Sequence, residues 1–347
     1  MEYVYFPVMK SRNSELKSYQ ELSRNIKNKI LPIVELTRSR ISKNNLNGSV
    51  DKKMEELSVI FSDHKFILDV TLEKTLSNHE ISNLLDCKDG YRAWVNFVIK
   101  YKEKMNFIPC IHFNPQSLQE VLKQIDLLDK KFPILALRLY ALDDDNRMYL
   151  DKIKNYLQKC VVILDAEDQD RNFDFLQYIK NIETDKAKAI VCVLSRFPST
   201  VPIINNGEVG KYSLGKYFLF EDYQNVFYGD YALVCAKRYD MQARGWIPRI
   251  DIPIFDKNEI EFLYCRYRTS DKYDTEQAYM KCANTLYLDY RINFDDNENW
   301  GKKMVLEAKN GYVAGKNPSF WIAVRNNIYI NQIACILEAK SKKLKLD

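Results

Sequence analysis

A short apolar run that ends in acids is the first place in this sequence where chemistry could be done. The run spans residues 160–164, and Asp165 and Glu167 follow it. Both parities of the run are apolar, which is typical of a strand buried on both faces in a parallel sheet. The acids come where such a strand leaves the sheet, and carboxylates there can act as general acids or bases.

The same pattern, an apolar run with a polar residue at its carboxyl end, recurs along the chain. The residues at these ends are Lys10, Glu35, Asp69, His112, Arg138, Asp165 with Glu167, and Ser195 with Arg196. In a parallel α/β barrel, such ends face one common mouth. The candidate catalytic residues are therefore Glu35, Asp69, His112 and Asp165. The candidate substrate-binding residues are Lys10, Arg138, Glu167 and, on a later strand, Arg249.

Three interpretations of this mouth are open. In the first, Lys10 and Arg138 neutralise the carboxylates in a salt-bridged plug, because buried charges must be paired. In the second, two carboxylates divide acid and base roles in a hydrolytic site, and the two cations hold an anionic group such as a phosphate. In the third, Glu35, Asp69 and Asp165 bind magnesium or manganese, since oxygen ligands suit these ions. The spacing itself demands no metal.

His112 and Arg249 each have two interpretations. At a strand end, His112 could serve as a general acid or base, or it could be a buried histidine under a loop. Arg249, with Arg266 and Arg268, could extend a basic rim toward a phosphate-bearing ligand. The alternative, which we favour, is pairing with Asp251 and Glu261 across a hairpin.

The elements that must position these residues alternate between strands and helices. Apolar runs predict strands at 4–10, 30–36, 65–70, 106–113, 132–139, 160–168 and 189–194, with helices between them, including 143–158 and 173–182. The segments 217–223 and 231–236 are both candidates for an eighth strand. A strand pair at 246–252 and 261–267 follows, joined by a turn at 256–258, and helices complete the chain.

Strand–helix alternation predicts either a closed barrel or an open parallel sheet. The repeat number nears eight, which favours a TIM-like (β/α) barrel. Residues 10–13 replace the glycine-rich first turn of a dinucleotide-binding fold, which favours the barrel further. We expect residues 1–236 to form the barrel core. Residues 237–347 are expected to add a strand pair and helices that pack on the barrel or complete it.

Composition excludes several classes of protein. The chain has 347 residues, of which 46% are hydrophobic, so a large core can form. No apolar run approaches the roughly 20 residues that cross a bilayer, and residues 1–4 lack a signal-peptide pattern. The eight cysteines include no C-x-x-C pair. We therefore expect a cytoplasmic protein with no membrane partner and no zinc site.

Several short motifs resemble the beta-protein family, which is found in phages and in bacterial genomes. They lie at 5–15, 30–35, 228–231, 247–250 and 315–321. The chain departs from the family pattern after Asn327, where Ile328 and Tyr329 replace a pair of His. The resemblance implies a barrel-like α/β fold and an association with phage defence or phage biology. It implies no established reaction.

Together these observations favour an intracellular hydrolase that acts on a phosphorylated or otherwise anionic substrate and serves a phage-related defence role. The alternative is a non-catalytic subunit of a defence complex. Such a subunit would bind nucleic acid, a nucleotide or a partner protein through the same rim.

Overall fold

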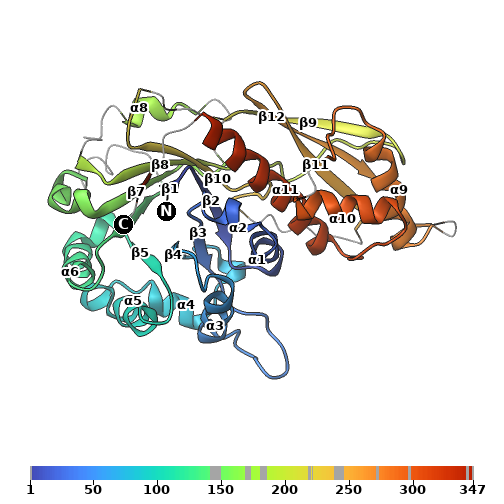
Figure 1. Ribbon diagram of the computed structural model, residues 1–347. Coiled ribbons are helices and arrows are strands. Elements are labelled where there is room, and N and C mark those ends of the chain that lie inside the picture. The colour runs from blue at the N-terminus through green and yellow to red at the C-terminus, as the bar shows by residue number, and fades with distance from the viewer. Residues whose placement is uncertain are drawn as a thin grey trace.

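A closed barrel of parallel strands forms the larger part of the molecule in this computed structural model (Figure 1). The structure describes residues 2–140, 150–168, 173–179, 186–217, 220, 222–237, 246–270, 273–295, 298–340 and 344–345. Around the barrel the strand order is β10-β2-β3-β4-β5-β6-β7-β8. The predicted TIM-like (β/α) barrel is therefore confirmed.

Most barrel strands lie inside the apolar runs that predict them. They are β2 (Tyr5–Lys10), β3 (Ile33–Leu36), β4 (Phe66–Val70), β5 (Phe107–Ile111), β6 (Leu135–Leu139), β7 (Cys160–Asp165), β8 (Ala189–Leu194) and β10 (Val226–Asp230). Neighbouring strands pair in parallel throughout the barrel. Both faces of these strands are buried, one in the barrel interior and one under the surrounding helices, which explains why these segments are apolar at both parities.

Both candidates for the eighth strand are wrong. The described residues of 217–223 and of 231–236 are not strands, and the strand that closes the barrel, β10, lies between them. Strand β10 was not predicted, because a glycine such as Gly229 weakens the pattern of a strand. In the structure a Cβ at Gly229 would lie 2.6 Å from the carbonyl oxygen of Phe6, so the close approach of β2 to β10 requires glycine there.

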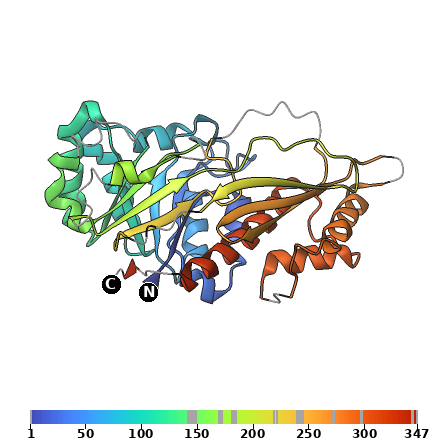
Figure 2. The same cartoon turned by 90° about the horizontal axis from the view of Figure 1, so that it is seen from above.

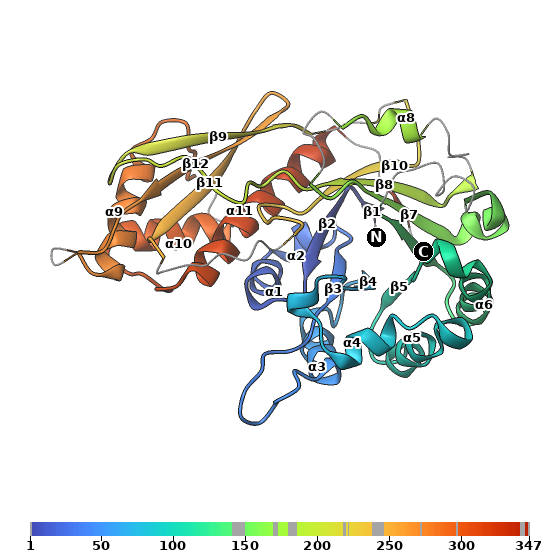
Figure 3. The same cartoon turned by 180° about the vertical axis from the view of Figure 1, so that it is seen from behind.

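Helices cover the outside of the barrel (Figure 3). They are α1 (Asn13–Gln20), α2 (Arg24–Lys27), α3 (Val50–Ile60), η1 (Lys74–Leu76), α4 (His79–Leu84), α5 (Lys88–Tyr101), η2 (Pro115–Ser117), α6 (Leu118–Asp129), η3 (Lys154–Lys159) and α8 (Phe175–Ile179). Of the helix predicted at 143–158, residues 143–149 lie outside the described residues, and its end forms the 3-10 helix η3. Residues 180–182 of the helix predicted at 173–182 also lie outside them.

A second sheet with its own helices extends from one side of the barrel (Figure 1). Its antiparallel order is β11-β12-β9. Its elements are β9 (Val209–Lys216), β11 (Arg249–Asp256), β12 (Glu259–Arg266), α9 (Thr275–Tyr287), α10 (Trp300–Lys309) and α11 (Pro318–Ala339). The predicted strand pair is thus present, whereas β9 was missed. Because β9 precedes β10, the chain visits this sheet before it closes the barrel, and a division at residue 236 stays a prediction.

Both ends of the described chain lie at the amino-terminal end of the barrel (Figure 2). There β1 (Glu2–Tyr3) pairs antiparallel with β13 (Leu344–Lys345). Among the described helices, none combines the length and the apolar character needed to cross a membrane.

A buried carboxylate joins the closing strand of the barrel to the last helix. Asp230, at the end of β10, accepts hydrogen bonds from the hydroxyls of Tyr5 on β2, Tyr228 on β10 and Tyr329 on α11. Its Oδ1 also accepts the backbone N–H of Ala232 at 2.8 Å. The residue is only 4% exposed, so these donors replace the water that the charge loses on burial.

We predict that Tyr329→Phe lowers the free energy of unfolding by about 1.5–3 kcal/mol, because it removes one donor to a buried charged group. Urea unfolding measures the loss. Tyr312→Phe is the matched control, since Tyr312 is 66% exposed and should tolerate the change. Equal stability of both variants would contradict the role of Asp230 as a junction.

Candidate active site

The carboxyl ends of five barrel strands direct charged side chains into the barrel. Side chains alternate along a strand, and the inner layer of the barrel contains Val8, Ile33, Ile67, Ala136 and Ile163. Two residues farther along each of these strands come Lys10, Glu35, Asp69, Arg138 and Asp165. All five side chains therefore form the uppermost inward layer, and all five residues are buried.

Arg138 lies at the centre of this layer. Its Nη1 donates to Asp69 Oδ2 at 2.9 Å, and its Nη2 donates to Glu35 Oε1 at 2.8 Å. Its Nε and Nη2 donate to Asp165 Oδ2 at 2.9 and 2.6 Å. One guanidinium thus binds three carboxylates from three other strands. The ion pairs expected of Arg138 in the salt-bridged interpretation are present.

Both carboxylate oxygens of Asp165 accept hydrogen bonds. Its Oδ2 accepts the Tyr231 hydroxyl at 2.8 Å as well as Arg138, and its Oδ1 accepts the backbone N–H of Glu167 at 2.8 Å. The side chain is 0% exposed. A carboxylate that is fully hydrogen-bonded and closed to solvent is suited to positioning Arg138, and it is poorly placed to exchange protons with a substrate.

Glu35 and Asp69 are the carboxylates nearest to solvent in the layer. They are direct register partners on β3 and β4, and each side chain is 7% exposed. Among the described residues, Glu35 Oε2 has only a long contact with Lys10, at 3.9 Å. Asp69 Oδ2 also accepts the Tyr140 hydroxyl at 3.3 Å, and Asp69 Oδ1 accepts the backbone N–H of Val70 at 2.8 Å. Two adjacent carboxylates with unequal partners are the arrangement that acid–base chemistry needs.

The ammonium group of Lys10 contacts groups of the same chain. Its Nζ donates to the carbonyl oxygen of Ala236 and lies 3.9 Å from Glu35 Oε2 and 3.8 Å from Glu73 Oε2. Lys10 and Arg138 therefore face more carboxylates than they can neutralise. This acidic balance does not support the anionic substrate expected from the sequence, since both cations assigned to hold it already have partners.

The magnesium or manganese interpretation gains no ligand group from the structure. Within the part of the chain that is described, no three His, Cys, Asp or Glu side chains are arranged to hold a metal ion. Arg138 lies among Glu35, Asp69 and Asp165, where such an ion would have to bind. A divalent metal cofactor therefore stays a prediction from the sequence.

His112 does not join the group at the mouth. Strand β5 ends at Ile111, so the alternation that would point His112 inward stops one residue too early. The imidazole stacks on Trp94 of α5 with ring centroids 4.5 Å apart, and Tyr91 packs edge-on at 5.6 Å. Burial lowers the pKa of His112 to about 4. The structure therefore places His112 between barrel and helix, as in the buried-histidine interpretation.

Glu167 and Arg249 also lie away from the carboxylate group. Glu167 adopts a left-handed φ of 48°, which ends the strand alternation after Asp165, and its carboxylate pairs with Lys237 at 3.1 Å. Arg249 lies on β11 in the second sheet and pairs with Asp251 at 2.8 Å. The pairing of Arg249 with Asp251 is confirmed, but the two residues share one strand and do not pair across the hairpin.

Sequence reasoning missed Tyr140, Tyr231 and Glu73. The Arg138 guanidinium stacks 4.6 Å from the Tyr140 ring centroid and donates to the Tyr231 hydroxyl at 2.8 Å. Tyr140 could have been found, because it lies two residues beyond Arg138 and shares its parity. Tyr231 was hidden because it follows the strand that was misplaced. Glu73 lies in a loop, where no periodicity gives a signal.

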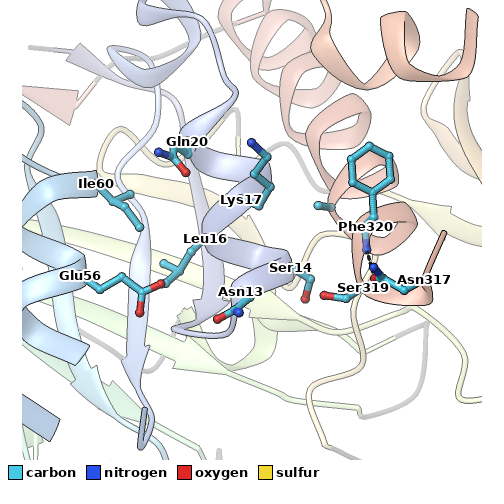
Figure 4. A pocket seen from close by; sticks show the side chains of 11 residues that line it. Asn13, Ser14, Leu16, Lys17, Gln20, Glu56, Ile60, Asn317, Ser319 and Phe320 are labelled. Atoms are coloured by element: carbon cyan, nitrogen blue, oxygen red, sulfur yellow. Dashed lines mark hydrogen bonds between the residues drawn. The ribbon is translucent and has the colours of Figure 1, made fainter. Parts of the chain in front are cut away.

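A separate hollow of about 330 Å³ lies outside the barrel, between α1, α3 and the start of α11 (Figure 4). Asn13, Ser14 and Lys17 line it from α1, Glu56 lines it from α3, and Ser319 lines it from α11. The resemblance motifs from the two ends of the chain meet here. The positions that depart from the family pattern pack nearby on α11: Ile328 is fully buried against Gly301, and Tyr329 donates to Asp230.

Residues 5–334 match the model of the family described as Beta protein. The chain is 28% identical to "Protein beta" of Enterobacteria phage P4, across 97% of this chain and 94% of that protein. Among solved structures it is similar to the spore cortex-lytic enzyme SleL of Bacillus megaterium QM B1551. That likeness has 12% identity and a TM-score of 0.34, and it covers 94% of this chain and 74% of SleL. A TM-score this low supports no inference about activity.

We predict that Arg138→Met destabilises the protein by about 3–5 kcal/mol, because it leaves three buried carboxylates without their common partner. Urea unfolding at neutral pH measures the change. Arg92→Met is the control, since the exposed pair of Arg92 with Asp89 should contribute less than about 1 kcal/mol. A similar small loss in both variants would contradict the central role of Arg138.

We also predict a pH dependence from His112. Its pKa of about 4 in the folded protein lies below the ordinary value of 6.5, so the unfolded chain binds the proton more readily. The stability that His112 contributes is therefore present above pH 6.5 and is lost as the pH falls toward 4. Between pH 8 and pH 5 this loss should be about 2 kcal/mol. Urea unfolding should show it in the wild type and in the control His79→Phe, but not in His112→Phe.

Proposed function

The chain belongs to the Beta protein family, whose name specifies no reaction, and from the site geometry we propose that the barrel mouth is the acid–base site of a hydrolase. Glu35 and Asp69 are the proposed catalytic pair. The observation that carries the proposal is their matched register on β3 and β4 at the mouth, where each side chain is 7% exposed. Among the described residues, Glu35 Oε2 has no ion-pair partner closer than Lys10, at 3.9 Å.

The remaining residues of the layer position this pair. Arg138 binds both catalytic carboxylates and fixes their separation, while Asp165 and Tyr231 fix Arg138. Burial raises the pKa of Tyr231 and of Tyr140 well above the ordinary value, so both hydroxyls keep their protons and act as donors. A rigid supporting shell of this kind holds acid and base at a constant distance from a bound substrate.

The charge of the mouth favours a neutral or cationic substrate. Glu35, Asp69, Asp165 and the nearby Glu73 outnumber Lys10 and Arg138, and the side chains of Glu35 and Asp69 are each 7% exposed. A phosphate would meet carboxylates before it met a free cation, and like charges repel at such distances. We therefore propose a substrate with a neutral or amine-bearing group at the scissile bond. A role in phage biology or phage defence is supported by the phage origin of one relative.

A non-catalytic role is the second candidate. It is favoured by the complete hydrogen bonding of Asp165 and by the three guanidinium nitrogens of Arg138, all of which have partners within the chain. In that case the layer would only stabilise the barrel, and the chain would act as a binding subunit for a partner protein or nucleic acid.

We predict that Glu35→Gln and Asp69→Asn each lower kcat at least about 100-fold, the usual contribution of an acid or base, with little change in melting temperature. Turnover of chromogenic glycosides, esters and cationic aminoacyl anilides, with p-nitrophenyl phosphate as the anionic comparison, provides the measurement. Asp51→Asn is the control, since Asp51 is exposed on α3 and should keep full activity. Undiminished turnover in both mouth variants, or a preference for the phosphate ester, would refute the proposal.

A further inference from the structure

The amino-terminal end of the barrel, opposite the mouth, carries a cluster of lysines on neighbouring loops. The loops that lead into β4, β5 and β6 contain Lys65, Lys102, Lys104, Lys130 and Lys131. The acids in the same loops are Asp63 and Glu103. Because β4, β5 and β6 are adjacent parallel strands, their leading loops lie side by side at one end of the barrel.

Four of the five lysines lie on the surface of the protein. Lys102, Lys104, Lys130 and Lys131 are all exposed. Within the described residues, Lys104, Lys130 and Lys131 form no ion pair, and Lys102 has only a 3.9 Å contact with the adjacent Glu103. Exposed contacts of this length contribute little energy, so they do not compete with a polyanion.

A hollow of about 380 Å³ opens beside Lys102 and Lys104. Lys65 and Glu103 also line it, together with the exposed Pro133 and with Phe132, which is only 4% exposed. Lys102 Nζ lies 5.8 Å from the centroid of the Phe132 ring. The hollow is at the small end of the range for ligand sites, which is the right scale for a single nucleobase.

We propose that this face binds single-stranded nucleic acid. Lys102, Lys104, Lys130 and Lys131, on the two loops that lead into β5 and β6, contact successive phosphates. One unstacked base enters the hollow beside Pro133. Neighbouring strands are about 4.8 Å apart, so the two loops lie side by side and present their four charges to a few nucleotides. Cationic grooves with apolar or aromatic platforms are the usual means of holding single strands.

Two other polyanions fit less well. In a duplex the bases are stacked and paired, so none can enter the hollow without being extruded. An acidic peptide commonly binds by adding a strand to an open sheet edge. Here β4, β5 and β6 are each paired on both sides in the closed barrel, so no such edge borders the hollow.

Fluorescence anisotropy with the full chain tests the proposal. The probes are a labelled single-stranded oligonucleotide, its duplex, an abasic oligomer of equal length, ATP and a glutamate-rich peptide. We expect the single strand to bind at least about 10-fold more tightly than the abasic oligomer, the duplex or ATP. Its log affinity should fall with log salt with a slope of about −3, as expected for four phosphate contacts at about −0.7 each.

The lysines are tested with a matched pair of variants. A variant that changes four lysines to Glu should bind the single strand more than about 30-fold more weakly, and its affinity should depend less steeply on salt. The four are Lys102, Lys104, Lys130 and Lys131. The control changes the equally exposed Lys43, Lys52, Lys257 and Lys303 to Glu, which alters net charge by the same amount and should retain more of the affinity. Melting temperatures establish that both variants fold.

Equal loss in the two variants would assign binding to net charge alone and overturn the site. Tighter binding of the peptide, the duplex or ATP than of the single strand would overturn the proposed ligand, as would equal binding of the abasic oligomer. None of these outcomes bears on the carboxylates of the mouth, which lie at the other end of the barrel. The two proposals can therefore fail independently.

Discussion

The burial of one guanidinium among three carboxylates is the constraint on which the mouth of this barrel depends. Arg138 cannot be taken out of water unless its donors find acceptors, and Glu35, Asp69 and Asp165 cannot be buried together without a shared cation. Only a closed barrel brings four different strands to one point with the required register. The charged layer and the closure of the barrel thus require each other, and a slip of any strand by one residue would turn its charge toward the helices.

Buried charges also need partners where the second sheet meets the barrel. Asp230 accepts three tyrosine hydroxyls from β2, β10 and α11, so the last helix is fixed to the strands that close the barrel. Asp251 on β11 accepts Arg325 of α11 at 2.6 Å, and the Arg325 guanidinium stacks 4.1 Å from the ring of Phe197, just beyond β8. Buried charges at both junctions restrict how the two parts can pack, because each charge must find its partner.

The two ends of the barrel differ in chemistry. The mouth concentrates carboxylates around two cations that already have partners, whereas the opposite end presents lysines with few acids nearby. The two proposals therefore place polyanion binding at the lysine end and exclude it from the mouth. If both proposals hold, a strand bound at the lysine face would stay clear of the mouth, and binding and hydrolysis would use separate surfaces of one protein.

The sequence by itself determined most of the barrel strands, because continuous apolar runs with polar ends that alternate with helical patterns are typical of strands buried on both faces. It also placed Lys10, Glu35, Asp69, Arg138 and Asp165 at one mouth, since parity and strand direction follow from local pattern. The tertiary structure alone decided where each strand stops. Because β5 and β7 end before them, His112 and Glu167 do not lie at the mouth. Val226–Asp230 is the strand that closes the barrel, and Tyr231, which follows it, contacts Arg138. The residue at which a strand ends depends on neighbours that are distant along the chain, so the local spacing of apolar residues does not predict it.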